Sequence, residues 1–367
     1  MDNRVLLVGW GRSVNYGTNL QTIALYEIIN QKYKCDFLYS RKYCSSKLFV
    51  KKAIKKLRSK IKKEGGVTPE KNRNIDKCYE NIRKINLNSP SDKKIILSKY
   101  NTFVVGSDQV WNPGYLESTY LLDFVPKGYR KISYASSIGV NTIPKKCHKI
   151  YCKYLSDFSY ISMREQGAKC ISKMIRRSVD TVLDPTLLLS SLEWKEICSK
   201  EVNNISSSLP DKYLLCYFVG NMAQHMKEIQ DISKEMNLKI VVLPITEQET
   251  RLSEGVVINN AGPKEFVAAV NGATMVCTDS FHMCAFSLNF QKEFWVFKRF
   301  NDNSSSSQNS RIDNLFSEFG INRYFNDGDR QSLDYNRISI SLKNKRIECK
   351  KLLFSAIDGK VAAIHSS

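Results

Sequence analysis

A histidine stands at an abrupt change of character in the last third of the chain. The stretch TMVCTDSFHMCAFSLNF (274–290) passes from an apolar segment through Asp279 and Ser280 to His282 and a second apolar segment. Asp279 and Ser280 are good helix N-cap residues, so we expect His282 in the first turn of a helix. The positive end of a helix lowers an imidazole pKa, which keeps the group neutral near pH 7 and able to exchange protons. His282 is therefore a candidate catalytic acid/base, and a packed core histidine is the alternative.

Two further stretches place polar groups where expected parallel strands end, which is where α/β sheets bind ligands. In GWGRSVNYGTNLQ (9–21), glycines allow a close approach of the backbone to a ligand, and a helix start favours anions. The stretch lacks the spacing of a dinucleotide-binding fingerprint. In VVGSDQVWNPG (104–114), Gln109, Trp111 and Asn112 are more than a turn and a helix cap require.

Arg164 closes a largely apolar expected strand in YISMREQGA (160–168). A guanidinium group cannot be buried alone, so Arg164 needs an anion. That anion is Glu165, Asp184, or a carboxylate or phosphate of a ligand held by two parallel hydrogen bonds. The sequence leaves a structural and a ligand-binding role of Arg164 equally open.

The elements that must position these residues alternate between strands and helices. Apolar runs at 4–10, 35–40, 102–107, 131–139 and 160–165 predict strands of a first unit, and 212–220, 239–245, 274–280 and 293–297 predict strands of a second. The pattern predicts an α/β protein with two Rossmann-like domains whose parallel sheets face a central cleft. We expect an N-terminal domain at 1–200, a C-terminal domain with His282 at 201–332, and a closing helical segment at 333–367.

Composition narrows the class of protein and of partner. The chain has 367 residues, 56 Lys and Arg against 36 Asp and Glu, and a net charge of +20, which indicates an anionic partner. Nucleic acid, an acidic membrane face and a phosphorylated substrate all fit the charge. Eleven cysteines without a Cys-x-x-Cys pair predict free thiols in a reducing cytosol and no zinc site. The sequence contains no apolar run of about 18 residues, so no transmembrane helix is expected. The N-terminus predicts a first strand and not a signal peptide.

A basic segment, KLFVKKAIKKLRSKIKK (47–63), holds nine basic residues and no acidic one. On a helix, its apolar residues would form one narrow stripe between lysines, which is typical of a helix lying at a membrane surface. The alternative is a surface helix whose stripe packs on the core. Nucleic-acid binding is less favoured because aromatic residues are not interleaved. The expected membrane-facing residues are Lys51, Lys52, Lys55, Lys56, Arg58 and Lys62.

Eight stretches in order resemble the polysaccharide pyruvyl transferase family over about residues 4–320. They are NYGTNLQ, VVGSDQVWNP, SYASSIG, SMREQGA, VLDPTLLL, GPKEFV, TDSFHMCAFSLNFQKEFWVF and NSRIDNLF. The resemblance implies a GT-B-like fold and transfer of the carboxyvinyl group of phosphoenolpyruvate onto sugar hydroxyls, giving a pyruvate ketal and phosphate. It implies acceptors that are bacterial capsule, exopolysaccharide or cell-wall intermediates, often lipid-linked. It implies no metal and no cofactor beyond the donor, and a cytoplasmic protein at the inner face of the membrane.

The resemblance also implies roles for single residues. His282 matches a proposed acid/base histidine in an Arg-Leu-His stretch, and Arg164 matches an arginine that holds phosphoenolpyruvate. Ser280 stands where that stretch has its arginine, so another cation must supply the charge, and Arg311 is the first choice ahead of Arg12 and Lys298. The expected phosphoenolpyruvate-binding residues are Arg164, Ser280, Phe281 and Arg311. The expected acceptor-binding or cleft-lining residues are Asn15, Tyr16, Gly17, Gln21, Ser107, Asp108, Gln109, Trp111 and Asn112.

Two other functions stay open at this point. The first is a glycosyltransferase of the same architecture that uses a nucleotide sugar. The second is a non-catalytic carbohydrate- or membrane-binding relative, which Ser280 in place of an arginine keeps open.

Overall fold

The first sheet is a parallel sheet built from the first half of the chain. The computed structural model describes residues 4–40, 68–140, 142–164, 167–199, 205, 208–245, 255–299, 310–329 and 331–360. Within these ranges, seven strands pair in the order β3-β2-β1-β4-β5-β6-β7, every pair parallel. The strands are β1 (Arg4–Val8), β2 (Lys34–Ser40), β3 (Lys84–Asn86), β4 (Thr102–Val105), β5 (Arg130–Ser136), β6 (Tyr160–Met163) and β7 (Asp180–Thr181).

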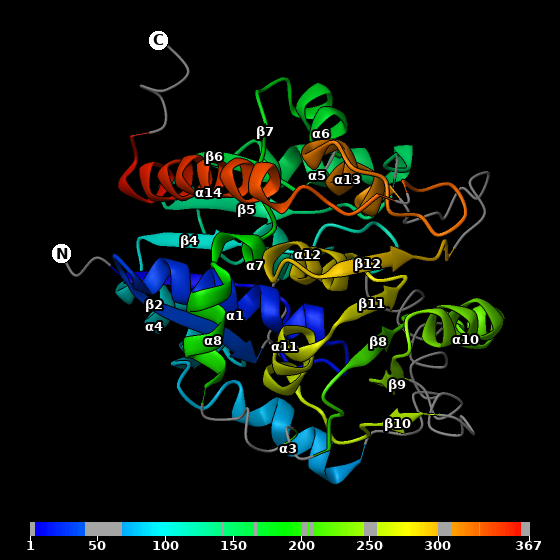
Figure 1. The fold of residues 1–367 in the computed structure, drawn as a ribbon. Coiled ribbons are helices and arrows are strands. Elements are labelled where there is room, and N and C mark those ends of the chain that lie inside the picture. Colours follow the sequence, from blue (N-terminus) through cyan, green and yellow to red (C-terminus); the bar gives the residue numbers. More distant parts are fainter. Residues whose placement is uncertain are drawn as a thin grey trace.

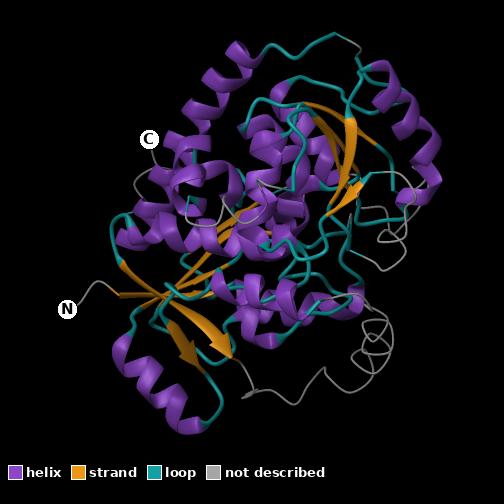
Figure 2. Cartoon of the chain, turned by 60° about the horizontal axis from the view of Figure 1, so that its bottom comes forward, coloured by secondary structure: helices purple, strands orange, loops and turns teal. Residues whose placement is uncertain are grey.

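The second sheet repeats this architecture in the second half. Its described strands pair in the order β10-β9-β8-β11-β12, again all parallel. The strands are β8 (Tyr213–Tyr217), β9 (Lys239–Val242), β10 (Val256–Val257), β11 (Met275–Thr278) and β12 (Glu293–Val296). Figure 2 shows the strands gathered in two separate groups with helices around and between them. The predicted α/β class with two parallel sheets is confirmed.

In each sheet the strand order reverses beside the first strand. In the first sheet β1 lies between β2 and β4, and in the second sheet β8 lies between β9 and β11. Ligands of open parallel sheets bind at such switch points, beyond the carboxyl ends of the strands. The loops after β1, β4 and β11 therefore lie where chemistry is expected, and these loops carry most of the residues singled out from the sequence.

Two helices between the sheets are buried on nearly all sides. Helix α1 (Tyr16–Asn30) follows β1 and buries 13 of its 15 residues, and α12 (Phe281–Asn289) follows β11 and buries all nine. Both helices lie in the interior, and their buried polar side chains, such as Asn19, Gln21 and Asn289, make hydrogen bonds there. Both helices start at the switch points, so their N-termini lie within the protein.

The two halves share one packed core. Tyr16 of α1 packs its ring against Tyr217 of β8 and Phe266 of α11 (Pro263–Gly272), with ring centroids 5.4 and 5.1 Å apart. The largest cluster of buried apolar residues likewise draws on both sheets. This continuity holds the loops of the two sheets against each other.

Two helices cross from one half of the chain to the other. Helix α3 (Pro69–Lys77) comes from the first half, yet the Lys71 Nζ donates to the Pro244 carbonyl at 2.8 Å and the Asn74 Nδ2 to the Asn260 carbonyl at 2.8 Å. Helix α14 (Tyr335–Asp358), red in Figure 1, is the last of the described elements and packs beside β5 and α7. Helix α14 lies within the segment 333–367 that was expected to be helical.

The remaining helices cover the sheets. They are α4 (Pro90–Lys99), η1 (Ser118–Leu121), α5 (Lys145–Leu155), α6 (Gly167–Ile175), α7 (Pro185–Leu188), α8 (Ser191–Cys198), η2 (Met222–His225), α10 (Met226–Glu235) and α13 (Ser310–Phe319). None of the described helices is both long and apolar enough to cross a membrane.

Candidate active site

His282 is the second residue of α12 and lies in the first turn, as its N-cap signal predicted. The Ser280 hydroxyl accepts a long hydrogen bond of 3.5 Å from the Met283 amide, and Thr278 in turn accepts from the Ser280 amide at 3.0 Å. Only 6% of His282 is exposed. The strand–cap–helix junction therefore aims the imidazole at the space between the sheets.

The imidazole of His282 rests directly on Gly17 in the first turn of α1. A Cβ atom built on Gly17 would lie 2.2 Å from the His282 Nδ1, well inside van der Waals contact. A glycine at this position lets the two buried helices bring their N-termini together. The amide groups at both helix starts add positive potential around the imidazole.

Asp184 faces His282 from the opposite side. Its Oδ2 lies 3.8 Å from the His282 Nε2, which is buried and has no hydrogen-bond partner in the described structure. Asp184 is the N-cap of α7, and its other oxygen accepts from the Thr186 amide at 2.9 Å and hydroxyl at 2.7 Å. The carboxylate is thus held in place while one edge remains beside the imidazole.

Arg164, at the end of β6, joins Asp184 to a second carboxylate. Its Nη1 donates to Asp184 at 2.7 Å and its Nη2 to Asp108 at 3.1 Å, with the Arg164 side chain only 3% exposed. The guanidinium carbon lies 4.5 Å from the centre of the Phe281 ring. The anion required by a buried Arg164 is therefore supplied by Asp184, one of the candidates from sequence, together with Asp108.

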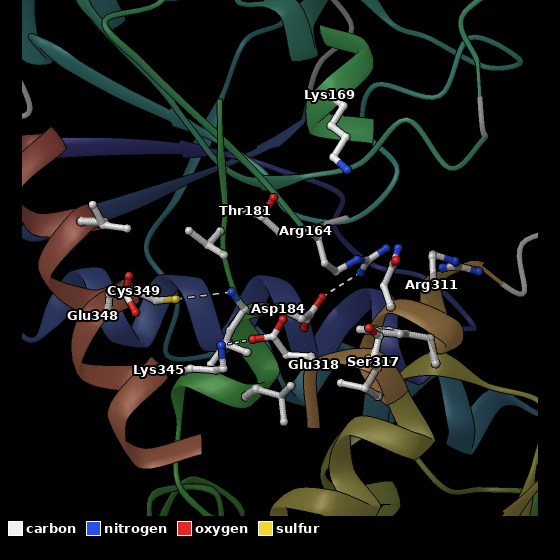
Figure 3. Close-up of a pocket in the computed structure, with 17 residues that line it drawn as sticks. Arg164, Lys169, Thr181, Asp184, Arg311, Ser317, Glu318, Lys345, Glu348 and Cys349 are labelled. Carbon is white, nitrogen blue, oxygen red and sulfur yellow. Dashed lines mark hydrogen bonds and ion pairs between the residues drawn. The ribbon is translucent and has the colours of Figure 1, made fainter. Parts of the chain in front are cut away.

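A cavity of about 370 Å³ adjoins this cluster. Arg164, Phe281 and Arg311 of α13 line one end, and the Arg311 Nη1 lies 3.9 Å from Asp108. Lys345, Glu348 and Cys349 of α14 line the other end, with Lys169 of α6 also on the wall (Figure 3). Arg311 thus brings a second guanidinium to the cavity end nearest His282.

The surrounding charges set the protonation of the central pair. Burial lowers the pKa of His282 below its ordinary value, and Arg164 and Arg311 lower it further, while Asp184 and Asp108 offset part of the effect. Burial alone would raise the pKa of Asp184, but His282, Arg164 and Thr186 together hold it below its usual value. Near pH 7 the site therefore holds a neutral imidazole beside an ionised carboxylate.

Several residues expected to line the cleft instead connect elements. Gln21 is fully buried and its Oε1 accepts from the Ser107 amide at 3.0 Å and from the Ser107 hydroxyl, which ties α1 to the loop after β4. Asn15 is the N-cap of α1 and accepts from the Thr18 amide at 3.4 Å. Tyr16 packs in the shared core, as described above. These side chains hold the walls of the site rather than its open surface.

Trp111 is a correction to the expected cleft lining. Its side chain is completely buried, the indole N–H donates to the Tyr120 carbonyl at 2.8 Å, and the ring packs against Phe158. Gln109 accepts at its Oε1 from the Asn112 Nδ2 at 2.9 Å and from the Tyr115 hydroxyl at 2.6 Å. The large ring of Trp111 is packed away from water, so Trp111 belongs to the core. The hydrogen bonds among Gln109, Asn112 and Tyr115 stabilise the loop after β4.

Arg12 and Lys298, the other two candidates to supply the positive charge that Ser280 lacks, pair with carboxylates elsewhere. Arg12 pairs with Asp76 of α3 at 2.6 Å, and Lys298 lies 3.5 Å from Asp327. Arg299 likewise donates to Asp279, at 2.9 Å. Of the cations considered from sequence, Arg164 and Arg311 are the ones that reach the cluster around His282.

Two expectations concern residues or ligands away from this cluster. The membrane-facing residues Lys51, Lys52, Lys55, Lys56, Arg58 and Lys62 lie outside the described residues. Across the described ranges, no group of three or more His, Cys, Asp or Glu side chains could hold a metal ion.

The sequence indicated Asp184 only as a possible partner of Arg164, and it indicated no role for Lys169. Asp184 had a visible signal, because it begins DPT after an apolar run and so reads as a helix cap before a proline. Its position beside His282 depends on how the two halves pack, which no local pattern encodes. Lys169 had no distinguishing signal among the many lysines of the chain.

Comparisons with known proteins identify the fold and the family. UDP-GlcNAc 2-epimerase from Neisseria meningitidis, bound to UDP-GlcNAc, matches at a TM-score of 0.51 and 10% identity over 96% of this chain and 99% of that one. The S. aureus MnaA–UDP co-structure matches at 0.52 and 11% over 98% and 90%. At such identities the likeness shows the fold alone, which is GT-B-like. No curated protein matches the chain.

The sequence model of the polysaccharide pyruvyl transferase family matches residues 15–299. This span runs from the N-cap of α1 to the end of the second sheet. It contains His282, Gly17, Asp108, Arg164 and Asp184, and Arg311 lies beyond its end. Because the match covers most of the chain, the chain belongs to the polysaccharide pyruvyl transferase family.

Proposed function

We propose that the protein transfers the carboxyvinyl group of phosphoenolpyruvate onto two hydroxyls of a sugar, forming a pyruvate ketal and releasing phosphate. The family makes it a transferase of polysaccharide biosynthesis. The observation that carries the proposal is the buried His282 Nε2, which has no hydrogen-bond partner in the described structure and lies 3.8 Å from Asp184 beside two arginines. A neutral imidazole next to a carboxylate is suited to take and return a proton.

The donor fits the end of the cavity that carries cations. Phosphoenolpyruvate has a carboxylate and a phosphate, and both favour guanidinium partners. Arg311 lines this end of the cavity, with its Nη1 3.9 Å from Asp108, and Arg164 donates to Asp184 and Asp108. We assign Arg311 and Lys169 to donor binding. We assign to Arg164 the orientation of the Asp184 and Asp108 carboxylates. Its guanidinium group also faces the donor, with the ring of Phe281 on its other side.

The reaction then proceeds in two steps. In the first, neutral His282 takes the proton of one sugar hydroxyl as the oxygen bonds to the enol carbon, and the proton passes to the methylene carbon, which becomes a methyl group. In the second, a neighbouring hydroxyl attacks the same carbon, the carbon–oxygen bond to phosphate breaks, and the hydroxyl proton passes through His282 to the departing phosphate. Asp184 stabilises the imidazolium that forms in each step. The products are the cyclic ketal and inorganic phosphate.

We place the acceptor at the other end of the cavity, beside α14. Glu318 and Lys345 form an ion pair in the cavity lining, which also includes Glu348. Side chains of both signs can donate to and accept from sugar hydroxyls. We propose a capsule, exopolysaccharide or cell-wall intermediate as acceptor, carried on a polyprenyl diphosphate at the inner face of the cytoplasmic membrane of a bacterium. The reaction as written uses no cofactor besides the donor.

The decisive experiment measures phosphate release from phosphoenolpyruvate with a panel of free and lipid-linked hexose acceptors. His282→Gln should lose at least about 100-fold in kcat, since a general acid/base contributes 10²–10⁴-fold. His148→Gln is the matched control, because His148 lies on α5 and contacts the Ile143 carbonyl. Turnover of a nucleotide sugar without phosphoenolpyruvate would instead establish a glycosyltransferase, and full activity of His282→Gln would remove the assigned role.

Membrane association has its own test. Co-sedimentation with vesicles containing acidic phospholipid should be strong at low salt and weak at high salt, as expected for basic residues near an anionic surface. Replacing Lys51, Lys52, Lys55 and Lys56 by glutamine should weaken it. Equal sedimentation of the two proteins would refute a role for the basic segment.

A further inference from the structure

Two short helices from different halves of the chain present the catalytic pair. Asp184 caps the N-terminus of α7 and His282 lies in the first turn of α12, and the two helices contact each other. Helix α7 has only four residues, too few to be stable alone, because helix nucleation is unfavourable. The separation of Asp184 and His282 therefore depends on what holds the other ends of these helices.

An arginine of the C-terminal helix binds the far end of α7. The Arg346 Nε donates to the Leu187 carbonyl at 2.6 Å, and its Nη2 donates to the Leu189 carbonyl at 3.3 Å. These carbonyls are among those that an α-helix leaves without partners at its C-terminus. Burial lowers the pKa of Arg346 to about 10, so this contact is made at a cost in solvation that the hydrogen bonds must offset.

The same arginine reaches the far end of α12. Its Nη2 also donates to the Asn289 Oδ1 at 2.7 Å, and Asn289 is the last residue of α12. The Asn289 Nδ2 donates in turn to the Leu189 carbonyl at 2.8 Å and more weakly to the Thr186 carbonyl at 3.4 Å. We call this arrangement of Arg346 and Asn289 the clamp. It closes a hydrogen-bonded ring around the C-terminal ends of both helices.

We propose that Arg346 and Asn289 are positioning residues that set the distance between Asp184 and His282 by fixing α7 against α12. The inference rests on the proposed function for its effect on turnover, although its effect on the pair itself does not. Arg346 lies beyond residue 299, where the family match ends, so the clamp adds a contribution of the C-terminal helix to a site whose reacting groups lie within the match. Neither clamp residue touches the site directly, and both act through helix position.

The first test reads the pair without any substrate. The His282 pKa, followed by NMR and assigned with His282→Gln, should shift in Arg346→Gln in the same direction as in Asp184→Asn. In the Asp184→Asn background, Arg346→Gln should add almost nothing, because the carboxylate whose position it controls is gone. A structural effect unconnected with Asp184 would give equal shifts in both backgrounds and would overturn the proposal. The outcome does not depend on whether phosphoenolpyruvate is the donor.

The second test uses turnover. Arg346→Lys keeps a positive charge but cannot reach three acceptors with one planar group, so it should resemble Arg346→Gln. Both should lose kcat on the order of 100-fold, as expected for a misplacement of about 1 Å, with the Michaelis constant for phosphoenolpyruvate nearly unchanged. Wild-type kcat in Arg346→Lys would contradict the clamp.

A cavity beside the clamp allows chemical rescue. About 470 Å³ of open space lies between α8, α12 and α14, and Arg346, Asn289 and Lys343 are among its lining residues. Guanidinium at millimolar concentration should enter and partly restore kcat of Arg346→Ala. Lys343→Ala is the matched control, because Lys343 lines the same cavity without taking part in the clamp, and it should retain activity and show no response. Absence of rescue in a folded Arg346→Ala protein would count against the proposal.

Discussion

At the scale of single residues, the site is a balance of two carboxylates and two guanidinium groups around one imidazole. Asp184 and Asp108 raise the pKa of His282, whereas burial, Arg164 and Arg311 lower it, and the lowering effects prevail. Small changes in any of these charges should therefore move the pH at which the histidine becomes neutral.

Removal of Arg311 gives a directional prediction. Arg311→Gln takes away a positive charge that lowers the His282 pKa, so the acid limb of the pH–rate profile should move to higher pH. Donor affinity should fall as well. Lys298→Gln removes an equal charge outside the cluster and should leave the limb in place. The measurement is kcat/KM for phosphoenolpyruvate as a function of pH, and a limb that moves to lower pH would contradict the charge balance.

The contact between Gly17 and His282 gives a second prediction. Gly17→Ala places a methyl group 2.2 Å from the His282 Nδ1, so the imidazole must move and kcat should fall at least tenfold. Stability should fall by about 1–3 kcal/mol through overpacking. Gly272→Ala is matched, because its methyl group would lie 2.6 Å from the Tyr213 hydroxyl, away from the site. It should destabilise the protein but leave the kcat of folded enzyme unchanged.

Residue types predicted where single site residues lie, but they predicted less of how those residues contact one another. The cap signal at Ser280 predicted the position of His282, and the charge of Arg164 in an apolar strand predicted an anionic partner, either an acidic side chain or a ligand. Trp111 was misjudged because a polar neighbourhood in sequence does not reveal which side of a loop faces the core. The pairing of His282 with Asp184 arises from residues about 100 positions apart, so only the packed structure could show it.

At the scale of elements, helix α3 connects the two halves of the chain, and no local sequence pattern predicted this connection. Its buried Lys71 donates to the Pro244 carbonyl at 2.8 Å and lies 4.8 Å from the centre of the Tyr16 ring. Arg12, in the loop before α1, pairs with Asp76 of the same helix. Helix α3 therefore connects the loop after β1 to loops of the second half of the chain.

Loss of this connection should be measurable. Lys71→Met keeps the length and apolar stem but leaves the Pro244 carbonyl without its donor, which should cost about 1–3 kcal/mol of unfolding free energy. Arg73→Met, at an exposed position of the same helix, should cost less than about 0.5 kcal/mol. Urea denaturation compares the two. Equal stability of both variants would show that α3 contributes nothing through Lys71.

Long elements were easier to predict than short ones. Continuous apolar runs predicted the central strands, and helices were expected after the 9–21 stretch and in the C-terminal segment, where α1 and α14 lie. The two- and three-residue strands β3, β7 and β10 lie at the sheet edges and carry too few residues for a pattern. Their place is set by neighbouring strands, not by their own sequence.

At the scale of the whole molecule, the buried histidine connects fold stability to pH. The folded pKa of His282 is lowered, whereas an unfolded histidine has a pKa near 6.5. Below about pH 6.5 the unfolded chain therefore binds more protons than the folded one. The stability contributed by neutral His282 is fully present above that pH and is lost as the pH falls toward the lower folded value.

The unfolding free energy should thus decline as the pH falls below about 6.5, and His282→Gln should flatten this part of the curve. Urea titrations across that range provide the measurement. Asp184 also has a lowered pKa, so its contribution is lost only as the pH falls below about 3.8, outside this window. A decline of the same slope in His282→Gln would assign the effect to other groups.

The two-sheet architecture was predictable because both halves repeat the alternation of apolar strand and helix. How the halves meet was not predictable, since the Tyr16, Tyr217 and Phe266 contacts depend on shape and not on pattern.

The position of α14 has a consequence for synthesis of the protein on the ribosome. The first sheet ends at Thr181, but the helix packed beside β5 begins only at Tyr335. At about 5–20 residues per second, roughly 8–30 seconds separate the emergence of the two. During that interval the apolar surface that Leu342 and Leu353 later cover is open to solvent. We expect the nascent chain to need protection from aggregation until α14 emerges, and truncation before Tyr335 should give an aggregation-prone product although the described strands of both sheets precede that residue.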